Sequence, residues 1–495
     1  AILHSGLTAA QRHQEWRRVA AGEVAIVVGA RSAVFAPFPA GKLGLLIVDE
    51  EHDGSYKQDQ APRYHARDVA IRRGQLEEAT VVLGSATPSL ESYHNARQGR
   101  YRLHELRQRP TGATLPRVEI VDFVKANRER PRDRRIHLLT PRLEQAMLQT
   151  VRAGGQAMLL LNRRGFANYI CCPDHRCGWR MTCRHCDTTM VYHLHRKRSE
   201  SEQSGGDVLR GNTQPGAEDR GSVRCHHCQA QQRLPRDCPV CGKRVTAFGF
   251  GTQRVEEELA RLLPDLEASG GIARLDSDTM RRAEQYHEIL DRFAAGDIRL
   301  LVGTQMIAKG LDFPNVRLVG VVNADTALNL PDFRAAERTF QLVSQVAGRS
   351  GRAEHTGLVV VQTLQPDAAP IVHAARHDYR GFAEAELAMR ARVHLPPSTR
   401  LARVVVRHRE HGRAQEGATV LAAGLRRLLP DHEGLRLHGP MPCPISRIAD
   451  KHRQAVEILA PTATALQRFL TAARNAKLLH ADAGMAIDVD PIALL

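Results

Sequence analysis

The sequence predicts an α/β protein with two lobes of parallel sheet and helix, a cysteine-rich insertion in the second lobe and a small α+β domain near the C-terminus. Three observations carry this prediction. Short apolar runs alternate with amphipathic stretches, which is the pattern of a parallel sheet covered by helices. Nine of the ten cysteines lie between residues 171 and 241. After Pro396 and Pro397 the apolar runs become short and alternating.

Length and composition narrow the class of protein. A chain of 495 residues is expected to form about three domains, each able to bury its own core. Hydrophobic residues make up 42% and charged residues 25%, which excludes a disordered, collagen-like or coiled-coil chain. The net charge of +16 favours a polyanionic partner such as nucleic acid, although a proteome rich in arginine gives the same balance.

The expected strands end in polar residues, at the sheet edge where open α/β folds bind ligands. They are 43–50, 79–86, 156–162, 299–304, 317–325 and 357–363. A helix is expected over 256–263, and the Pro- and Arg-rich stretch RQRPTGATLPR is expected to be a hinge. No apolar run approaches the roughly 18 residues that cross a membrane, so no membrane contact is expected.

These patterns divide the chain into five expected segments. They are a first lobe (1–110), the start of a second lobe (111–168), a zinc-binding insertion (169–243), the remainder of the second lobe (244–385) and a small C-terminal domain (386–495). Within the insertion, 196–222 has few apolar residues and is expected to be a flexible loop.

The cysteines are spaced as metal ligands. A C-x-x-C turn directs two thiolates at one centre, and two such turns complete a tetrahedral zinc site. Disulfides are the alternative, but the flanking α/β pattern is typical of cytosolic proteins, where they are rare. Eight thiolates predict two Zn²⁺ ions. The inner set is Cys183, Cys186, Cys225 and Cys228. The outer set is Cys172, Cys177, Cys238 and Cys241, with Cys171 as an alternative first ligand.

Two strand ends carry groups suited to phosphate chemistry. In DEEH (49–52), Asp49 can hold Mg²⁺ and Glu50 can activate a water for attack on a γ-phosphate. An acidic cap after a strand is the plain alternative. GSAT (84–87) ends the next strand with small hydroxyl residues that can relay the state of a nucleotide.

Two later motifs add a loop and a pair of arginines. GTQMIAKGLDF (303–313) places Gly, Thr and Lys after a strand, where a backbone can approach phosphates. In QVAGRSGR, Arg349 and Arg352 are three residues apart near Gln345 and share one face if this stretch is helical, which suits the charge of a phosphoryl-transfer transition state. A solvated basic helix end is the alternative.

The order DEEH, GSAT, GTQMIAKG, QVAGRSGR is similar to that of motifs II, III, V and VI of superfamily 2 helicases. With RYHARD, NRRGFA, DFRAAER, the eight cysteines and the ending DVDPIALL, the chain resembles the primosomal protein N′ (PriA) family of replication-restart helicases. The resemblance implies two RecA-like lobes, the first incomplete, and ATP-dependent 3′→5′ unwinding of DNA. It also implies recognition of stalled or abandoned forks and assembly of a primosome. By the same resemblance, 1–110 is the remainder of the first helicase lobe and 386–495 is a C-terminal DNA- or partner-binding domain.

The resemblance also implies residue roles. Asp49 binds Mg²⁺, Glu50 is the hydrolytic base, His52 couples hydrolysis to DNA, and Arg349 and Arg352 contact the γ-phosphate. Coupling to the nucleotide is implied for Gly84, Ser85, Thr87, Gly310 and Gln345. DNA binding is implied for Tyr56, Lys57, Arg63, Tyr64, His65, Thr304 and Lys309. Tyrosine and histidine faces flanked by Lys and Arg are what base stacking with phosphate contact requires.

The implied cofactors are two Zn²⁺ and ATP with Mg²⁺. The implied partners are forked and single-stranded DNA, single-stranded DNA-binding protein, other primosome proteins and the replicative helicase. The expected location is the bacterial cytoplasm, in association with the nucleoid.

The chain departs from the family pattern in three places. Four residues separate Cys172 from Cys177, 38 separate Cys186 from Cys225, and G-x-x-x-x-G-K-[ST] is absent. We therefore expect a C-terminal fragment or truncated product that does not hydrolyse ATP by itself. A zinc-stabilised DNA-binding scaffold for replisome loading, without hydrolysis, is the alternative function. An RNA helicase shares the core motifs but not the eight cysteines.

Overall fold

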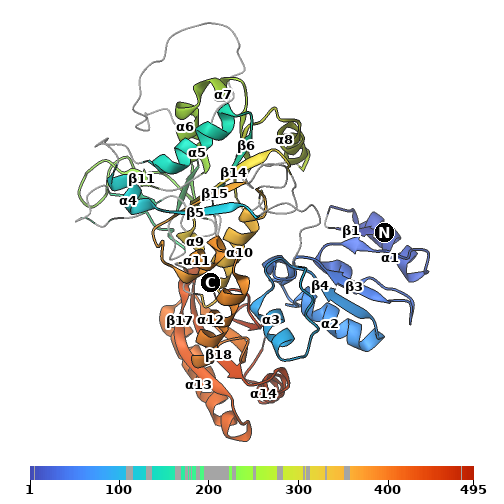
Figure 1. Ribbon diagram of the computed structural model, residues 1–495. Helices are drawn as coiled ribbons and strands as arrows, with labels where there is room; N and C mark the ends of the chain where they lie inside the picture. Colours follow the sequence, from blue (N-terminus) through green and yellow to red (C-terminus); the bar gives the residue numbers. More distant parts are fainter. Residues whose placement is uncertain are drawn as a thin grey trace.

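The computed structural model describes the chain except at residues 5, 107–114, 130–136, 162–168, 173–176, 178, 180, 186–189, 194–221, 226–229, 249–251, 276–282, 305–306, 308–312, 329, 331, 351–356, 481 and 495. The described part forms a first α/β lobe, a larger second α/β lobe, a cysteine-rich insertion and a C-terminal α+β unit (Figure 1). Among the described helices, none is both long and apolar enough to cross a bilayer.

The first lobe contains two short parallel sheets. Its strands are β1 (Ile2–Leu3) paired with β2 (Val28–Gly29), and β3 (Leu45–Val48) paired with β4 (Thr80–Leu83). Its helices are α1 (Ala9–Ala20), η1 (Arg31–Phe35), η2 (Gly54–Tyr56), α2 (Ala66–Glu77) and α3 (Leu90–Arg97). α1 begins at a capping box, in which Thr8 and Gln11 each accept the other's backbone N–H.

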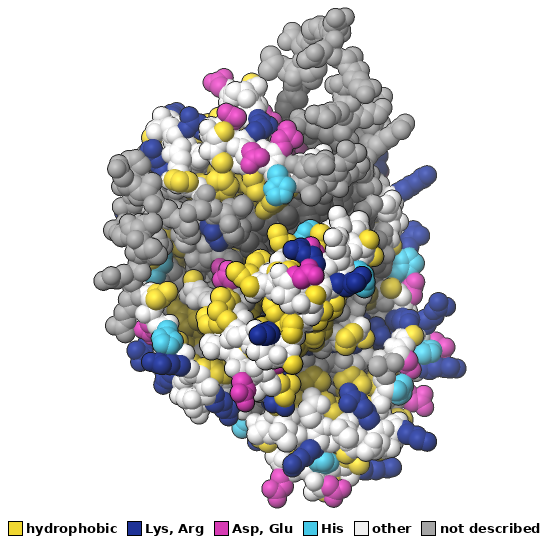
Figure 2. All heavy atoms as spheres, turned by 90° about the vertical axis from the view of Figure 1, so that its right-hand side faces the viewer, with side chains coloured by type: hydrophobic (Ala, Val, Ile, Leu, Met, Phe, Trp, Pro, Cys, Tyr) yellow, Lys and Arg dark blue, Asp and Glu magenta, His cyan; other side chains and the backbone are white. Residues whose placement is uncertain are grey.

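The β3–β4 pair has one uncovered face. Val48 is buried, whereas Leu45, Ile47 and Val82 are 52%, 66% and 45% exposed. Successive strand residues point to opposite faces, so these three share the outer face. Figure 2, which views the side where the first lobe lies, shows hydrophobic side chains gathered near the middle of the surface. An apolar sheet face is therefore open to solvent in this chain.

The second lobe is built on a six-stranded sheet in which every pairing is parallel, in the order β12-β13-β6-β14-β15-β5. The strands are β5 (Arg117–Asp122), β6 (Gln156–Leu161), β12 (Ile272–Leu275), β13 (Leu300–Gly303), β14 (Val316–Asn323) and β15 (Leu358–Thr363). β6, at the centre, is buried along its whole length, as expected for a parallel strand covered on both faces.

Helices cover both faces of this sheet, which gives three layers (Figure 1). One face packs against α5 (Pro141–Arg152) and α6 (Thr252–Leu262). The other face packs against α8 (Ala283–Ala295), α10 (Ala335–Ala347) and α11 (Ala369–Ala375). Among the described residues, the other α-helices of the lobe are α4 (Phe123–Arg128), α7 (Pro264–Ala268), α9 (Asp325–Leu328) and α12 (Tyr379–Arg392).

The cysteine-rich insertion leaves the second lobe after β6. Two strands pair antiparallel at its base, β7 (Tyr169–Cys171) and β11 (Thr246–Phe248). Three more form an antiparallel sheet, β8 (Val191–His193), β9 (Ser222–Arg224) and β10 (Gln231–Gln232). A small core of Ile170, Met181, Met190 and Val223 lies between them.

The C-terminal unit is an antiparallel sheet in the order β17-β18-β16-β19, with helices on one face. Its elements are β16 (Arg400–His408), α13 (His411–Leu428), η4 (Leu429–Asp431), β17 (Arg436–Ile448), β18 (Lys451–Ala460), α14 (Ala463–Asn475) and β19 (Met485–Val489). Side chains on the opposite face, including Arg403 and Asp488, contact other parts of the chain.

The predicted fold class is confirmed, and each of the six expected strands overlaps an observed strand. The helix expected over 256–263 is α6, which begins earlier. Two strands of the second sheet, β5 and β12, were not predicted. The motif NRRGFA and almost all of the loop expected over 196–222 lie outside the described residues.

Candidate metal centre and candidate active site

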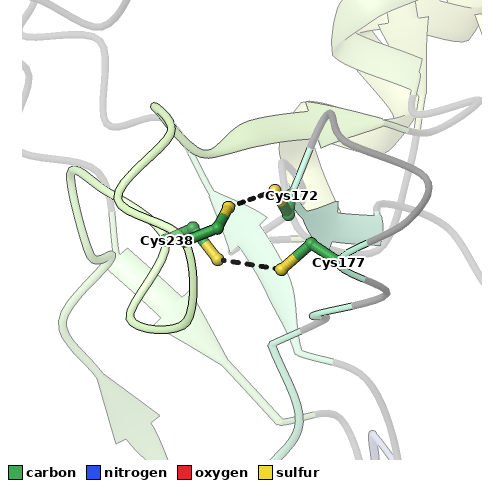
Figure 3. Close-up of side chains that lie close together, drawn as sticks. Cys172, Cys177 and Cys238 are labelled. Carbon is green, nitrogen blue, oxygen red and sulfur yellow. Dashed lines mark hydrogen bonds between the residues drawn. The ribbon is translucent and has the colours of Figure 1, made fainter.

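Four of the predicted zinc ligands lie together in the insertion. The Sγ atoms of Cys172, Cys177, Cys238 and Cys241 are all within 4.8 Å of one another. The closest pairs are Cys172 with Cys241, at 3.3 Å, and Cys177 with Cys238, at 3.6 Å (Figure 3). These four are the predicted outer set, and the side chain of Cys171, the alternative first ligand, lies outside the described part of the structure.

Local backbone turns direct these thiols inward. The N–H of Gly242 donates to the carbonyl of Cys238 at 2.9 Å, and the N–H of Cys238 donates to the carbonyl of Lys243. Gly242 has a φ of 72°, a left-handed conformation that glycine adopts at little cost. On the facing segment, the N–H of Cys172 donates to the carbonyl of Trp179. The C-x-x-C turn therefore folds because a glycine follows it.

The donor set fits a metal ion. In a tetrahedral zinc site with Zn–S bonds of about 2.3 Å, neighbouring sulfurs lie about 3.8 Å apart. The observed spacing is close to that value and far above a disulfide bond of about 2.05 Å. Burial raises the pKa of Cys238, but hydrogen bonds from the backbones of Cys241 and Val240 outweigh it and lower this pKa to about 7. A lowered pKa favours the thiolate that binds metal.

The predicted inner set is described only in part. Cys183 and Cys225 are both buried, and both belong to the small core of the insertion. Cys186 and Cys228 lie outside the described residues. The inner set therefore remains a prediction.

A second group of possible metal ligands lies in the second lobe, at His137, Glu144 and Glu258. The Glu258 carboxylate already accepts the backbone N–H groups of Leu138 and Leu139, at 3.0 and 3.3 Å. Burial raises the pKa of Glu258. These contacts give that carboxylate a structural role in holding the start of α5.

The acidic motif follows directly on β3. The Gly84 N–H donates to the Val48 carbonyl at 2.9 Å, and the Glu51 N–H donates to the Gly84 carbonyl at 3.0 Å, so the two strand ends stay paired beyond the sheet. Glu50 has a φ of 45°, a left-handed conformation that is uncommon for a residue with a Cβ and is frequent at functional sites. Its side chain is 40% exposed and can therefore reach water.

A histidine joins this motif to GSAT. His52 Nδ1 lies 2.7 Å from Ser85 Oγ and 3.5 Å from a carboxylate oxygen of Glu50. Ser85 Oγ also accepts the N–H of Thr87 at 3.0 Å. The structure thus brings together five of the residues predicted for the nucleotide site, with Gly84 between the strand ends. They are Glu50, His52, Gly84, Ser85 and Thr87.

The third acid of the motif, Glu51, was given no role by the sequence, and it is 1% exposed. Its carboxylate accepts the Ser89 N–H at 2.6 Å, the hydroxyls of Ser89 and Ser92 at 3.0 and 2.8 Å, and Arg67 Nη1 at 3.1 Å. Glu51 therefore ties the acidic loop to the start of α3. Arg67 belongs to RYHARD, one of the motifs on which the family resemblance rests. This motif was the signal in the sequence that could have pointed to the contact with Glu51.

The start of α3 in turn contacts the second lobe. The Leu90 N–H donates to Glu337 of α10 at 2.9 Å, and Glu91 is paired with Arg334. Burial opposes ionisation of Glu91, but Arg334 and Arg67 outweigh it and lower its pKa to about 2. Arg334 and Glu337 belong to DFRAAER, another motif of the family resemblance, to which the sequence assigned no function.

The predicted DNA-binding loop forms a closed turn after the acidic motif. Lys57 and His65 form an antiparallel bridge. Tyr56 donates its hydroxyl to the Asp49 carbonyl at 2.7 Å, and burial with the nearby acids raises its pKa. The Tyr64 ring meets Phe35 edge-on, with centroids 4.9 Å apart. Two tyrosines are thus held by the first lobe itself.

The basic residues of this loop face the C-terminal unit. Lys57 is 4% exposed and pairs with Asp488 at 2.9 Å. Arg63 donates to the Ile487 carbonyl at 3.3 Å. Burial and the adjacent Arg67 lower the pKa of His65 to about 4. The exposed part of the loop is its tip, 59–62.

The remaining predicted residues lie in the second lobe. Thr304 is buried at the end of β13. Gln345 lies in the last turns of α10, and Arg349 follows that helix, with its N–H donating to the Val346 carbonyl. Both side chains are half-buried. Lys309, Gly310 and Arg352 lie outside the described residues.

Two family models match the chain. The model described as "Helicase conserved C-terminal domain" matches residues 238–354, and "Primosomal protein N C-terminal domain" matches residues 391–492. The first match covers much of the second lobe, and the second covers the C-terminal unit.

Curated relatives match nearly the whole chain. "Replication restart protein PriA" of Bacillus subtilis (strain 168) is 41% identical, over 95% of this chain and 54% of that protein. The protein of the same name from Treponema pallidum (strain Nichols) is 38% identical, over 100% of this chain and 69% of that protein. The one from Haemophilus influenzae is 38% identical, over 99% and 62%. The chain thus spans between half and just over two thirds of the length of these relatives.

Proposed function

Because the chain belongs to the PriA family of replication restart proteins, we propose that it forms part of an ATP-dependent DNA helicase. The helicase unwinds DNA in the 3′→5′ direction, recognises stalled or abandoned forks and starts primosome assembly. Its partners are forked and single-stranded DNA, single-stranded DNA-binding protein, other primosome proteins and the replicative helicase. This activity places the protein in the cytoplasm, associated with the nucleoid.

The observation that supports hydrolysis most is the arrangement at the end of β3. Asp49 is proposed to hold Mg²⁺, and Glu50 to activate the attacking water, since its carboxylate is exposed. His52, hydrogen-bonded to Ser85 of GSAT, is proposed to couple hydrolysis to DNA. Arg349 and Arg352 are proposed to neutralise charge on the γ-phosphate.

Two zinc ions are proposed for the insertion. Cys172, Cys177, Cys238 and Cys241 would hold one, and their sulfur spacing supports this. Cys183, Cys186, Cys225 and Cys228 would hold the other, supported by the burial of Cys183 and Cys225. Such sites contribute folding free energy to a small domain, because the ligands are not assembled in the unfolded chain.

The loop after the acidic motif is proposed to contact single-stranded DNA. Its tip is exposed and its tyrosines are fixed, which favours stacking on a preformed surface. Thr304 and Lys309 are proposed to contact the strand from the second lobe. The net charge of +16 supports phosphate contacts.

The test is ATP hydrolysis measured with and without single-stranded DNA, on this chain and on a form extended upstream to a phosphate-binding loop. We expect hydrolysis stimulated by DNA only in the extended form, because positioning of the triphosphate supplies most of the catalysis. DNA binding by both forms without turnover in either would assign the protein to the alternative function, a scaffold. Turnover by the present chain alone would mean that the nucleotide site is misplaced.

A further inference from the structure

The last residues of the chain hold the proposed DNA loop in place. Lys57 Nζ donates to the carbonyls of Val489 and Asp490, at 2.6 and 3.3 Å, and pairs with the Asp488 carboxylate at 2.9 Å. A buried ammonium group must be fully paired to remain charged. The position of this part of the loop therefore depends on the segment 487–494.

Two further contacts run along the same segment. Arg63 donates to the Ile487 carbonyl at 3.3 Å. A Cβ added to Gly54 would lie 3.3 Å from Ile492 Cδ1, which shows how closely the loop approaches the segment. The segment thus contacts the loop at both ends, near Gly54 and near Arg63.

The same segment also contacts the second lobe. Arg338 of α10 donates to the Ile492 carbonyl and pairs with Asp332 at 3.1 Å. The Leu494 N–H donates to the same Asp332 carboxylate at 3.3 Å. Ile492 therefore lies between the DNA loop on one side and the first turn of α10 on the other.

The C-terminal sheet anchors the segment. Arg400 pairs with Asp490, and Arg403 donates to the Leu494 carbonyl. Figure 1 places the C-terminus at the centre of the molecule, where both lobes and the C-terminal unit approach one another. The segment is fixed to one unit and bonded to each of the other two.

The contact on α10 has a mechanical consequence. α10 has 13 residues, which makes it a rod of about 20 Å. Its first turn bonds the segment through Arg338, and Arg349 follows its last turn. A shift at one end of a rigid helix moves the other end.

We propose that the segment 487–494 is a positioning element that joins the DNA loop, through Lys57 and Ile492, to Arg338 and hence to Arg349. The proposal rests on the proposed function, since it assumes that the loop binds DNA. A plain brace, which only holds the parts together, is the competing explanation. The two differ in whether a disturbance at the loop reaches α10.

The first arm of the test uses no DNA. Deuterium uptake of the 495-residue chain is compared with that of Lys57→Met and Lys57→Arg. We expect Lys57→Met to raise uptake at least threefold in the loop, in 487–494 and in the first turn of α10. Lys57→Arg should restore the original uptake, because a guanidinium can donate to the same carbonyls. Uptake raised in the loop alone would overturn the proposal.

The second arm adds a single-stranded oligothymidine at saturating concentration. We expect it to change uptake in the loop and in the first turn of α10. Arg338→Met should leave the change in the loop and reduce the change in α10 at least threefold. Arg380→Met is the matched control, since Arg380 is an exposed arginine of α12. An unchanged response of α10 in Arg338→Met would contradict the proposal.

The two arms separate this inference from the proposed function. Oligothymidine that does not bind the chain would contradict DNA binding, and the first arm would still decide the coupling. Binding that changes the loop but not α10 in the unsubstituted chain would overturn the coupling and leave DNA binding standing.

Discussion

The backbone N–H of Leu90 in the first lobe donates to the Glu337 carboxylate of the second lobe at 2.9 Å, and both residues are buried. Glu337 also accepts Arg390 Nη2 at 3.0 Å, and Arg390 is fully buried and paired with Glu386. A single carboxylate thus satisfies an amide at the start of α3 and neutralises a buried guanidinium. Glu337 thus links the junction between the lobes to a buried charge of the second lobe.

Glu337→Gln should therefore lower the free energy of unfolding by on the order of 3 kcal/mol, because it leaves the charge of Arg390 less compensated in the interior. Urea denaturation measures this change. The Leu90 amide should also exchange faster. Glu384→Gln is the control: it breaks the exposed pair between Arg97 and Glu384, which also joins α3 to the second lobe. Glu384→Gln should unfold at nearly the same urea concentration as the unsubstituted chain. An equal decrease in the free energy of unfolding in both variants would contradict a special role for Glu337.

The free energy of unfolding should decrease as the pH is lowered from neutral, because of His65. Burial and Arg67, with a smaller effect of Lys57, lower its pKa to about 4 and outweigh the opposite effects of Asp68 and Glu91. Its pKa is thus lower in the folded than in the unfolded chain, so the neutral ring is favoured on folding. This stabilisation is complete above about pH 6.5 and is lost as the pH falls towards 4.

The loss between about pH 6.5 and pH 5 should reach about 2 kcal/mol. Denaturation of the chain and of His65→Gln at both pH values measures it. The variant should show a smaller decrease, whereas His480→Gln, at an exposed position, should behave like the unsubstituted chain. Equal pH dependence in all three would show that His65 is not responsible.

Metal analysis of the purified chain should give two zinc ions, and Cys238→Ser should lower the count to one. The outer set loses a ligand in this variant, while the inner set keeps all four. Cys443→Ser should retain both ions, since Cys443 lies in β17, outside the insertion. A count of one or none in the unsubstituted chain, or the same count in Cys238→Ser, would contradict this assignment.

Binding to single-stranded DNA should weaken steeply with salt, because phosphate contacts release counterions. The association constant should fall at least tenfold between about 50 and 200 mM salt, with little dependence on base sequence. Fluorescence anisotropy with oligonucleotides of different sequence measures both. Binding that is insensitive to salt would show that phosphate contacts do not drive it, and the net charge of +16 would then no longer support DNA as the partner.

In a form of the protein that hydrolyses ATP, Glu50→Gln should abolish turnover and leave nucleotide binding, since it removes the base but keeps the shape. Arg349→Ala should slow turnover by about 10³-fold or more. A phosphate-release assay measures both, and DNA affinity and zinc content should stay unchanged. Retained turnover in Glu50→Gln would assign the base to another residue.

The sequence predicted those parts of the fold whose signal is local. β6 and β15 are continuous apolar runs buried on both faces, and they were recognised as such. β5, at the edge of the sheet, was missed because Glu119 interrupts the apolar run in RVEIVD. β12 was missed because Arg274 interrupts its apolar run, IARL.

The same distinction holds for the candidate site. Close spacing within each pair of cysteines predicted the outer metal ligands, and strand ends predicted Asp49 and Ser85. The burial of Lys57 could not be predicted, because it depends on carbonyls of β19 and beyond. Backbone carbonyls carry no side-chain signal in a sequence, so a lysine that follows Tyr56 was interpreted only as a DNA contact.

The pairing of Lys57 with Val489 also sets an order of events during synthesis. The two residues are 432 positions apart. At about 5–20 residues per second, the ribosome needs roughly 20–90 seconds to travel from one to the other. Throughout that interval the lysine has no carbonyls to bind, so the nascent first lobe carries an unfinished loop beside an open apolar face. The loop that contains Lys57 therefore takes its final position only after residues 488–490 have been made.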